Sequence, residues 1–110
     1  MTIMTYRVII SDVALLDMES ALRYIRFTLQ NEKAADDLLD KADDAFISLA
    51  DYPGKFQLVN DPLLSSSGIR AVNINNYIAF YIVDESDKIV YVVRFIYSRR
   101  NWAKMLAIVS

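Results

Sequence analysis

The sequence predicts an α+β domain, in which a helical hairpin packs on a mainly antiparallel four-stranded sheet in the order β-α-α-β-β-β, with a short C-terminal helix. Three observations lead to this prediction. A β-branched run at 6–10 opens the chain, two amphipathic segments follow at 13–29 and 32–49, and three strand-like runs lie between 69 and 97. We treat residues 1–110 as one domain, because 110 residues is an ordinary size for a single domain.

The two helices are predicted from apolar residues spaced three or four positions apart. Ser11 or Asp12 can cap the first helix and Asn31 the second, since a short side-chain oxygen accepts from the free N–H groups of a first turn. Because the connection between them at Asn31 is so short, the two helices are expected to form a hairpin, which ends at Tyr52-Pro53-Gly54. The first stripe consists of Ala14, Leu15, Met18, Ala21, Leu22, Ile25 and Leu29, and the second of Ala35, Leu38, Leu39, Ala42, Ala45, Phe46 and Leu49.

The last three strands are predicted to form an antiparallel meander. Asn75-Asn76 and the polar run 84–87 are turn signals, and both are too short for crossover connections. Residues 77–83 are apolar at almost every position, which indicates a central strand covered on both faces. We expect 55–68 to be a long loop and 101–108 a helix. The hairpin would cover one face, leaving the other face or the open end of the sheet for a partner.

The composition excludes several classes of site. The chain has no cysteine and no histidine, so disulfides, thiolate metal sites and Ser-His or Cys-His catalysis are excluded, and no cofactor is expected. The aspartates of the second helix are interpreted as a solvated face, and no metal site is expected there. No apolar run approaches the ~20 residues of a membrane span, so no membrane partner is expected and the cytoplasm is the default location.

Charge divides the chain into an acidic and a basic half. Residues 1–54 carry five basic and ten acidic side chains, whereas residues 55–110 carry seven basic and four acidic ones. The predicted sheet can therefore meet an anion although the net charge is −2. Whole-molecule binding to nucleic acid is disfavoured, because such proteins usually have a pI above ~9.

At this point the ordered motifs resemble the RelE/ParE superfamily of type II toxin–antitoxin toxins, over nearly the whole chain. The motifs are YRVII (6–10), L-x-x-x-P (49–53), G-I-R (68–70), N-Y-I-x-F-Y-x-V-D-E (76–85) and V-x-V-V-R-F-I-Y-x-R-R-x-W (90–102). The resemblance implies a small cytoplasmic toxin held inactive by a cognate antitoxin, as a homodimer or a toxin–antitoxin heterotetramer. RelE-type members cut mRNA on the ribosome, whereas ParE-type members poison DNA gyrase.

If the chain is RelE-like, the resemblance makes Arg70, Arg94 and Tyr97 the catalytic residues. The two arginines would hold the phosphate and the charge that develops on it, and Tyr97 would relay a proton. For that, the phenol pKa would have to fall from its ordinary value of ~10. Each has a structural alternative: an ion pair for either arginine and an aromatic sheet cap for Tyr97. Period-2 alternation would place Arg94 on one face with Val92 and Ile96.

Three further basic residues, Arg99, Arg100 and Lys55, are expected to bind substrate. Arg99 and Arg100 could instead bind acidic antitoxin side chains or lie in a solvated turn, and Trp102 is expected to pack the last helix. Ribosome-dependent members tend to be strongly basic, whereas here the second helix is acidic. This departure favours the alternatives, which are a gyrase inhibitor lacking nuclease activity or a degenerate antitoxin-binding member. The first prediction is nevertheless a toxin that cleaves ribosome-bound mRNA.

Overall fold

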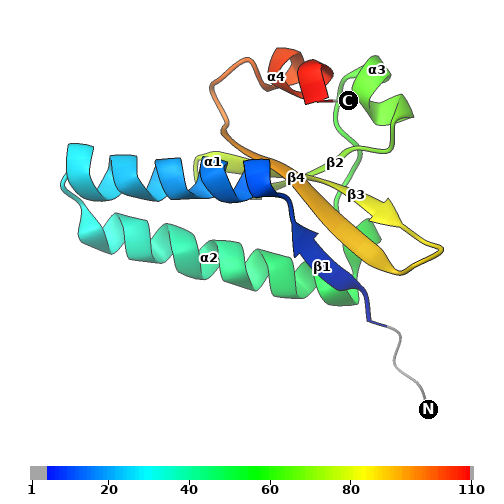
Figure 1. The fold of residues 1–110 in the computed structure, drawn as a ribbon, viewed down its shortest axis with the longest axis horizontal. Coiled ribbons are helices and arrows are strands. Elements are labelled where there is room, and N and C mark those ends of the chain that lie inside the picture. Colours follow the sequence, from blue (N-terminus) through cyan, green and yellow to red (C-terminus); the bar gives the residue numbers. More distant parts are fainter. Residues whose placement is uncertain (1–4, 110) are drawn as a thin grey trace.

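A four-stranded sheet with the strand order β1-β4-β3-β2 lies between two helical layers (Figure 1). The computed structural model describes residues 5–109. The strands are β1 (Arg7–Ile10), β2 (Arg70–Ile74), β3 (Tyr77–Asp84) and β4 (Ile89–Tyr97). The β1–β4 pair is parallel and the other two pairs are antiparallel, which confirms the mainly antiparallel sheet and the central position of β3.

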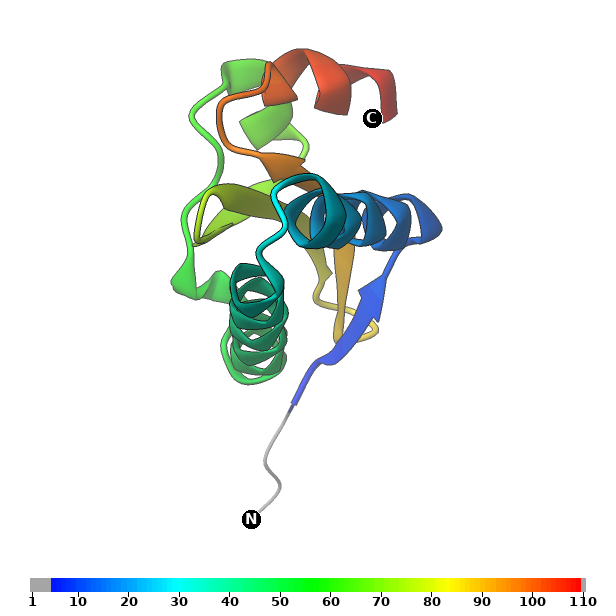
Figure 2. The ribbon, with the colours of Figure 1, turned by 90° about the vertical axis from the view of Figure 1, so that its left-hand side faces the viewer.

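The first layer is the predicted helical hairpin, whose arms lie side by side in both views (Figures 1 and 2). It consists of α1 (Asp12–Arg23), a π-helical turn η1 (Tyr24–Thr28) and α2 (Glu32–Asp51). The Ser11 hydroxyl oxygen accepts from the Ala14 N–H, and the Asn31 side-chain oxygen accepts from the Ala34 N–H, both at 3.0 Å. Both predicted caps are therefore formed, and they set where each helix begins.

Most of the two apolar stripes pack on the sheet, but Leu29 does not. Its N–H donates to the Tyr24 carbonyl, five residues back, at 3.0 Å, which is the hydrogen bond of a π-helix. This wider turn changes the 3.6-residue period after Ile25, so Leu29 leaves the buried stripe and is 55% exposed. Leu15 and Leu39 are exposed as well, and for these three residues the predicted core was wrong.

The opposite face of the sheet is covered by the chain itself. There α3 (Pro62–Ser66) and α4 (Trp102–Val109) pack over a second apolar cluster, which includes Phe80 and Ile96. The Trp102 ring lies 5.3 Å from the Phe80 ring, as expected for packing. The expectation that this face is left for a partner was wrong.

The segment 55–68 also contains more structure than a loop. Asp61 accepts from the N–H groups of Leu63 and Leu64 at 3.1 Å, and Pro62 starts the helix with its fixed φ. These two residues give α3 a start signal that the serine-rich composition concealed. Upstream, Leu58 forms an isolated bridge to Arg70, so this segment covers the outer edge of β2. None of the helices formed by residues 5–109 combines the length and apolar character that crossing a bilayer requires.

A β-bulge in β4 decides where Arg94 points. Phe80 pairs with Arg94, but the next residue of β3, Tyr81, pairs with Val92, so β4 has one extra residue there. As a result Phe95 joins Val92 in the core under the hairpin, whereas Ile96 lies in the opposite cluster. The expectation that Arg94 shares a face with both Val92 and Ile96 was wrong.

Candidate functional site

Arg94 is held in an ion pair that joins β4 to α1. Its Nε donates to Oδ2 of Asp17 at 2.7 Å and its Nη2 donates to Oδ1 at 3.0 Å. The Phe95 N–H donates to the same carboxylate at 3.0 Å, and only 15% of the Arg94 side chain and 17% of the Asp17 side chain are exposed. The hydrogen bonds to Asp17 raise the pKa of Arg94 above its ordinary value. This pair occupies two donors of the guanidinium.

Arg70 begins β2, two strands across the sheet from Arg94: Arg70 pairs with Tyr81 of β3, and Arg94 pairs with Phe80. The Arg70 Nη1 donates to the Phe56 carbonyl at 2.6 Å, and its strand neighbour Tyr81 donates through its hydroxyl to the Pro53 carbonyl at 2.6 Å. Burial raises the pKa of the Tyr81 phenol, and the nearby Arg70 charge opposes that rise. Arg70 pairs with Tyr81 and Tyr97 with Tyr77, so four residues of β3, about 13 Å, separate them along the strand. The structure does not bring Arg70 together with Arg94 and Tyr97.

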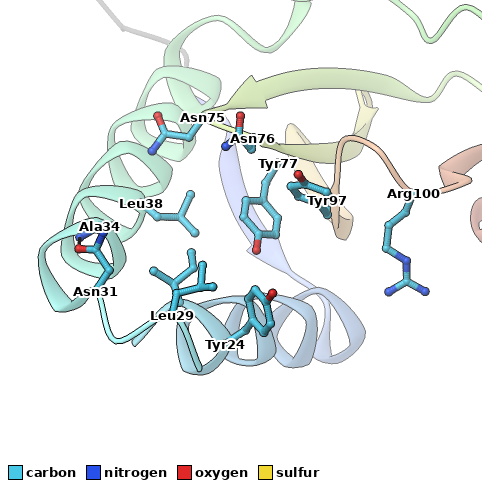
Figure 3. A pocket seen from close by; sticks show the side chains of 11 residues that line it. Tyr24, Leu29, Asn31, Ala34, Leu38, Asn75, Asn76, Tyr77, Tyr97 and Arg100 are labelled. Carbon is cyan, nitrogen blue, oxygen red and sulfur yellow. Dashed lines mark hydrogen bonds between the residues drawn. The ribbon is translucent and has the colours of Figure 1, made fainter. Parts of the chain in front are cut away.

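A groove of about 590 Å³ lies between the bend of the hairpin, the start of β3 and the end of β4 (Figure 3). We call it the hairpin groove. One wall comes from η1 and the residue that follows it (Tyr24, Leu29), and another from the cap and first turns of α2 (Asn31, Leu38). The floor comes from Tyr77 and Tyr97. Leu29 belongs to this wall because the π-helical turn removes it from the core.

The floor of the hairpin groove is an aromatic stack. The Tyr77 ring is stacked on Phe95, with centroids 5.1 Å apart, and meets Tyr97 edge-on at 5.6 Å. Burial raises the pKa of Tyr77, and the neighbouring phenols of Tyr97 and Tyr24 raise it further. The Tyr77 phenol therefore stays neutral near pH 7, and the floor is an apolar surface with hydroxyl groups at its edge.

The rim is polar and carries one cation, Arg100. The amide of Asn75 donates to Asp37 at 3.1 Å, which lowers the pKa of that carboxyl group, while Arg100 extends from the segment after β4 (Figure 3). Within residues 5–109 the exposed Arg100 side chain has no ion pair or hydrogen bond. Its backbone N–H donates to the Tyr97 carbonyl at 3.0 Å, which ties it to the end of the sheet.

A second cavity of about 280 Å³ adjoins the hairpin groove through Tyr77, Tyr97 and Arg100. Arg94 and Asp17 lie in its wall, so the structure brings together three of the six predicted site residues: Arg94, Tyr97 and Arg100. Arg99 is exposed and lines neither cavity. Lys55 lies over the Phe56 ring, at 5.5 Å, in the segment that holds Arg70. Among residues 5–109 no three carboxylates are arranged to hold a metal ion.

Comparison with known proteins identifies the family. The family model described as the ParE toxin of type II toxin–antitoxin system, parDE, matches residues 8–102. The chain belongs to the ParE toxin family. The predicted RelE/ParE membership is thereby confirmed. No curated protein matches the sequence closely enough to add a relative.

Two solved structures share the ParE-type fold. A chain of the toxin–antitoxin complex RelBE2 from Mycobacterium tuberculosis is 16% identical, with a TM-score of 0.60, and the match covers 84% of this chain and 98% of that chain. A chain of the chromosomal ParDE toxin–antitoxin system of P. aeruginosa is 14% identical, with a TM-score of 0.68, covering 87% and 98%. At these identities the likeness concerns the fold.

Sequence reasoning did not identify most of the hairpin groove of this ParE-family chain. Asn31 and Asn75 were interpreted only as cap and turn residues, and Leu29 as core. One signal was present: Tyr24 and Phe27 lie outside the buried stripe of the first helix, and both aromatic side chains are exposed. Exposed aromatic residues next to a helix end could have pointed to an interaction surface.

Proposed function

We propose that this ParE-family toxin acts by binding DNA gyrase and inhibiting it, and that it does not cut mRNA itself. The observation that carries the proposal is the bidentate pair between Arg94 and Asp17, at 2.7 and 3.0 Å. A phosphodiester would have to displace this carboxylate before Arg94 could stabilise the charge of a transition state. The guanidinium is thus used to fasten α1 to β4.

The arrangement of the other candidates supports the same proposal. Cleavage through a 2′-hydroxyl needs a base, an acid and positive charge at one place. Arg70 lies about 13 Å along the sheet from Tyr97 and donates to a backbone carbonyl. Inhibition by binding requires only a complementary surface, such as the hairpin groove.

A cognate antitoxin is the second part of the proposal. The two solved structures described above come from toxin–antitoxin systems. The chain also exposes many large apolar side chains, among them Leu16, Phe27 and Ile47, and extensive exposed apolar surface is typical of protein interfaces. We propose that both the antitoxin and gyrase are met in the cytoplasm.

Two assays on the purified chain test the proposed target. In the first, gyrase supercoils a relaxed plasmid, and the protein is expected to inhibit this and to accumulate cleaved gyrase–DNA complexes. In the second, a ribosomal translation mixture is expected to keep its mRNA intact. Ribosome-dependent mRNA cleavage with unimpaired supercoiling would overturn the proposal in favour of the RelE-type function.

A variant of Arg94 sharpens the distinction. Arg94→Met removes the guanidinium but keeps an apolar stem, and the folded variant is expected to inhibit gyrase within about two-fold of the parent chain, because the side chain is not used in chemistry. Inhibition should be compared per folded molecule, with the folded fraction measured by circular dichroism. A folded Arg94→Met protein without activity would contradict this view.

A further inference from the structure

The hairpin groove combines an apolar floor with a single available charge. Tyr77 and Tyr97 form the floor, while Tyr24 and Leu29 stand at the wall and are each more than half exposed. Phe27, three residues after Tyr24 in η1, is exposed as well. These side chains belong to the classes that anchor protein interfaces, where tyrosine and arginine contribute a large share of the binding energy.

The charged groups around the hairpin groove differ in whether they are already paired within the chain. Asp17 and Arg94 neutralise each other in the adjoining wall, and Asp37 accepts from Asn75 and pairs with Lys41 at 3.4 Å. That leaves Arg100 as the lining cation without a side-chain partner in the part of the chain that the structure describes. A single guanidinium beside an apolar floor complements a single anionic group next to an apolar one.

We infer that the hairpin groove receives a peptide segment of the antitoxin, in which an apolar side chain packs on Tyr77 and Tyr97 while a neighbouring aspartate or glutamate pairs with Arg100. This inference rests on the antitoxin part of the proposed function and is independent of the gyrase part. The asparagines of the rim, Asn31 and Asn76, supply amide groups for the backbone of such a segment.

A nucleic acid fits the hairpin groove less well than an acidic peptide. Affinity for RNA or DNA comes largely from several cations, each neutralising one phosphate. Here Arg100 is the one lining cation without a side-chain partner in the part of the chain that the structure describes. One carboxylate needs only one partner, and the apolar floor then adds affinity that salt does not screen.

Charge reversal at Arg100 tests the inference directly. The probe is the small protein encoded by the reading frame beside this gene, titrated calorimetrically into the full-length toxin. Arg100→Glu is expected to weaken binding by about 30-fold, because it removes the cation and repels the carboxylate. The matched control is Arg99→Glu, since Arg99 is also exposed, carries the same charge and lines neither cavity. The control is expected to change binding by less than about 3-fold.

A charge swap identifies the partner group. Each aspartate and glutamate of the antitoxin is replaced by lysine in turn, and one replacement is expected to restore at least about 10-fold of the affinity lost in Arg100→Glu. Binding of Arg100→Glu within about 2-fold of the parent chain, an equal loss in Arg99→Glu, or no rescue by any lysine would overturn the inference.

The nucleic-acid alternative has its own outcome. A fluorescein-labelled ten-nucleotide RNA is titrated into the same proteins, and no saturable binding that depends on Arg100 is expected. RNA binding that Arg100→Glu abolishes, with antitoxin affinity unchanged, would assign the groove to nucleic acid. A negative gyrase assay would refute the proposed target and leave these binding results as they stand.

Discussion

Arg94 lies near the end of β4 and Arg100 three residues beyond that end, yet their environments are opposite. Arg94 is 15% exposed and bonded at two nitrogens to Asp17, whereas Arg100 is exposed and has no side-chain partner within residues 5–109. The difference comes from α1, whose Asp17 bonds to Arg94 and forms no ion pair with Arg100, although all three residues line the second cavity. An arginine-rich strand end therefore contains one structural cation and one that is available to a partner.

The bulge in β4 explains why the two differ. The extra residue between the Phe80–Arg94 and Tyr81–Val92 pairs places Phe95 in the core under the hairpin and leaves Arg94 within reach of Asp17. Bulges often re-aim a side chain in this way. The comparison predicts that substitutions around Arg94 change the stability of the protein, whereas substitutions at Arg100 change what it binds.

The largest effect is expected from Asp17→Ala. This substitution leaves the mostly buried Arg94 guanidinium without its counter-charge and removes the acceptor of the Phe95 N–H. Breaking one partner of a buried ion pair is strongly destabilising, and after allowance for partial exposure we expect a loss of about 2–3 kcal/mol in the free energy of unfolding. Urea unfolding followed by circular dichroism measures this loss.

The control for Asp17→Ala lies on the same helix. Glu19 pairs with Arg23 at 3.9 Å, and both side chains are mostly exposed, so Glu19→Ala is expected to cost less than about 0.5 kcal/mol. Equal losses for the two variants would show that Asp17 acts only through the charge or propensity of α1, and the contrast between Arg94 and Arg100 would lose its basis.

A smaller loss of stability is expected from Tyr81→Phe, a substitution next to the third arginine, Arg70. Tyr81→Phe removes the hydroxyl that donates to the Pro53 carbonyl in the buried region beside Arg70. Leaving that carbonyl unpaired should cost about 1–2 kcal/mol. It should not change antitoxin affinity, because Tyr81 lies four residues, about 13 Å, along β3 from Tyr77 of the hairpin groove and does not line it. Thermal unfolding measures the loss of stability, and calorimetric titration measures the antitoxin affinity. A matching loss of affinity would mean that the Tyr81 region is coupled to the hairpin groove.

Local rules predicted much of the fold. The helix starts at Ser11 and Asn31 follow from hydrogen-bonding chemistry within four residues, and the turn at Asn75, where φ is 54°, follows from the tolerance of asparagine for this conformation. The central position of β3 follows from its apolar run. Each of these signals is contained in a short segment, so one sequence is enough to recognise it.

The candidate site depended on features that such segments do not contain. The bulge beside Arg94 and the π-helical turn before Leu29 are shifts of one residue in the backbone period, and each moved a side chain to a different surface. The partner of Arg94 is 77 residues away in the sequence. A carboxylate brought in from so distant a helix could not be assigned without the fold, and it decides which arginine is free.

The smallest effect on stability is expected from Arg100→Ala. Because the side chain is exposed and has no intramolecular partner among residues 5–109, its removal should change the free energy of unfolding by less than about 0.5 kcal/mol. Urea unfolding of this variant beside Asp17→Ala therefore measures the contrast between the two arginines, and their difference should exceed about 1.5 kcal/mol. If Arg100→Ala instead destabilised the chain as much as Asp17→Ala, Arg100 would be a structural cation too. The weaker antitoxin binding expected of Arg100→Glu would then reflect a damaged fold instead of a lost contact. A near-zero change ties any loss of antitoxin affinity to the guanidinium itself.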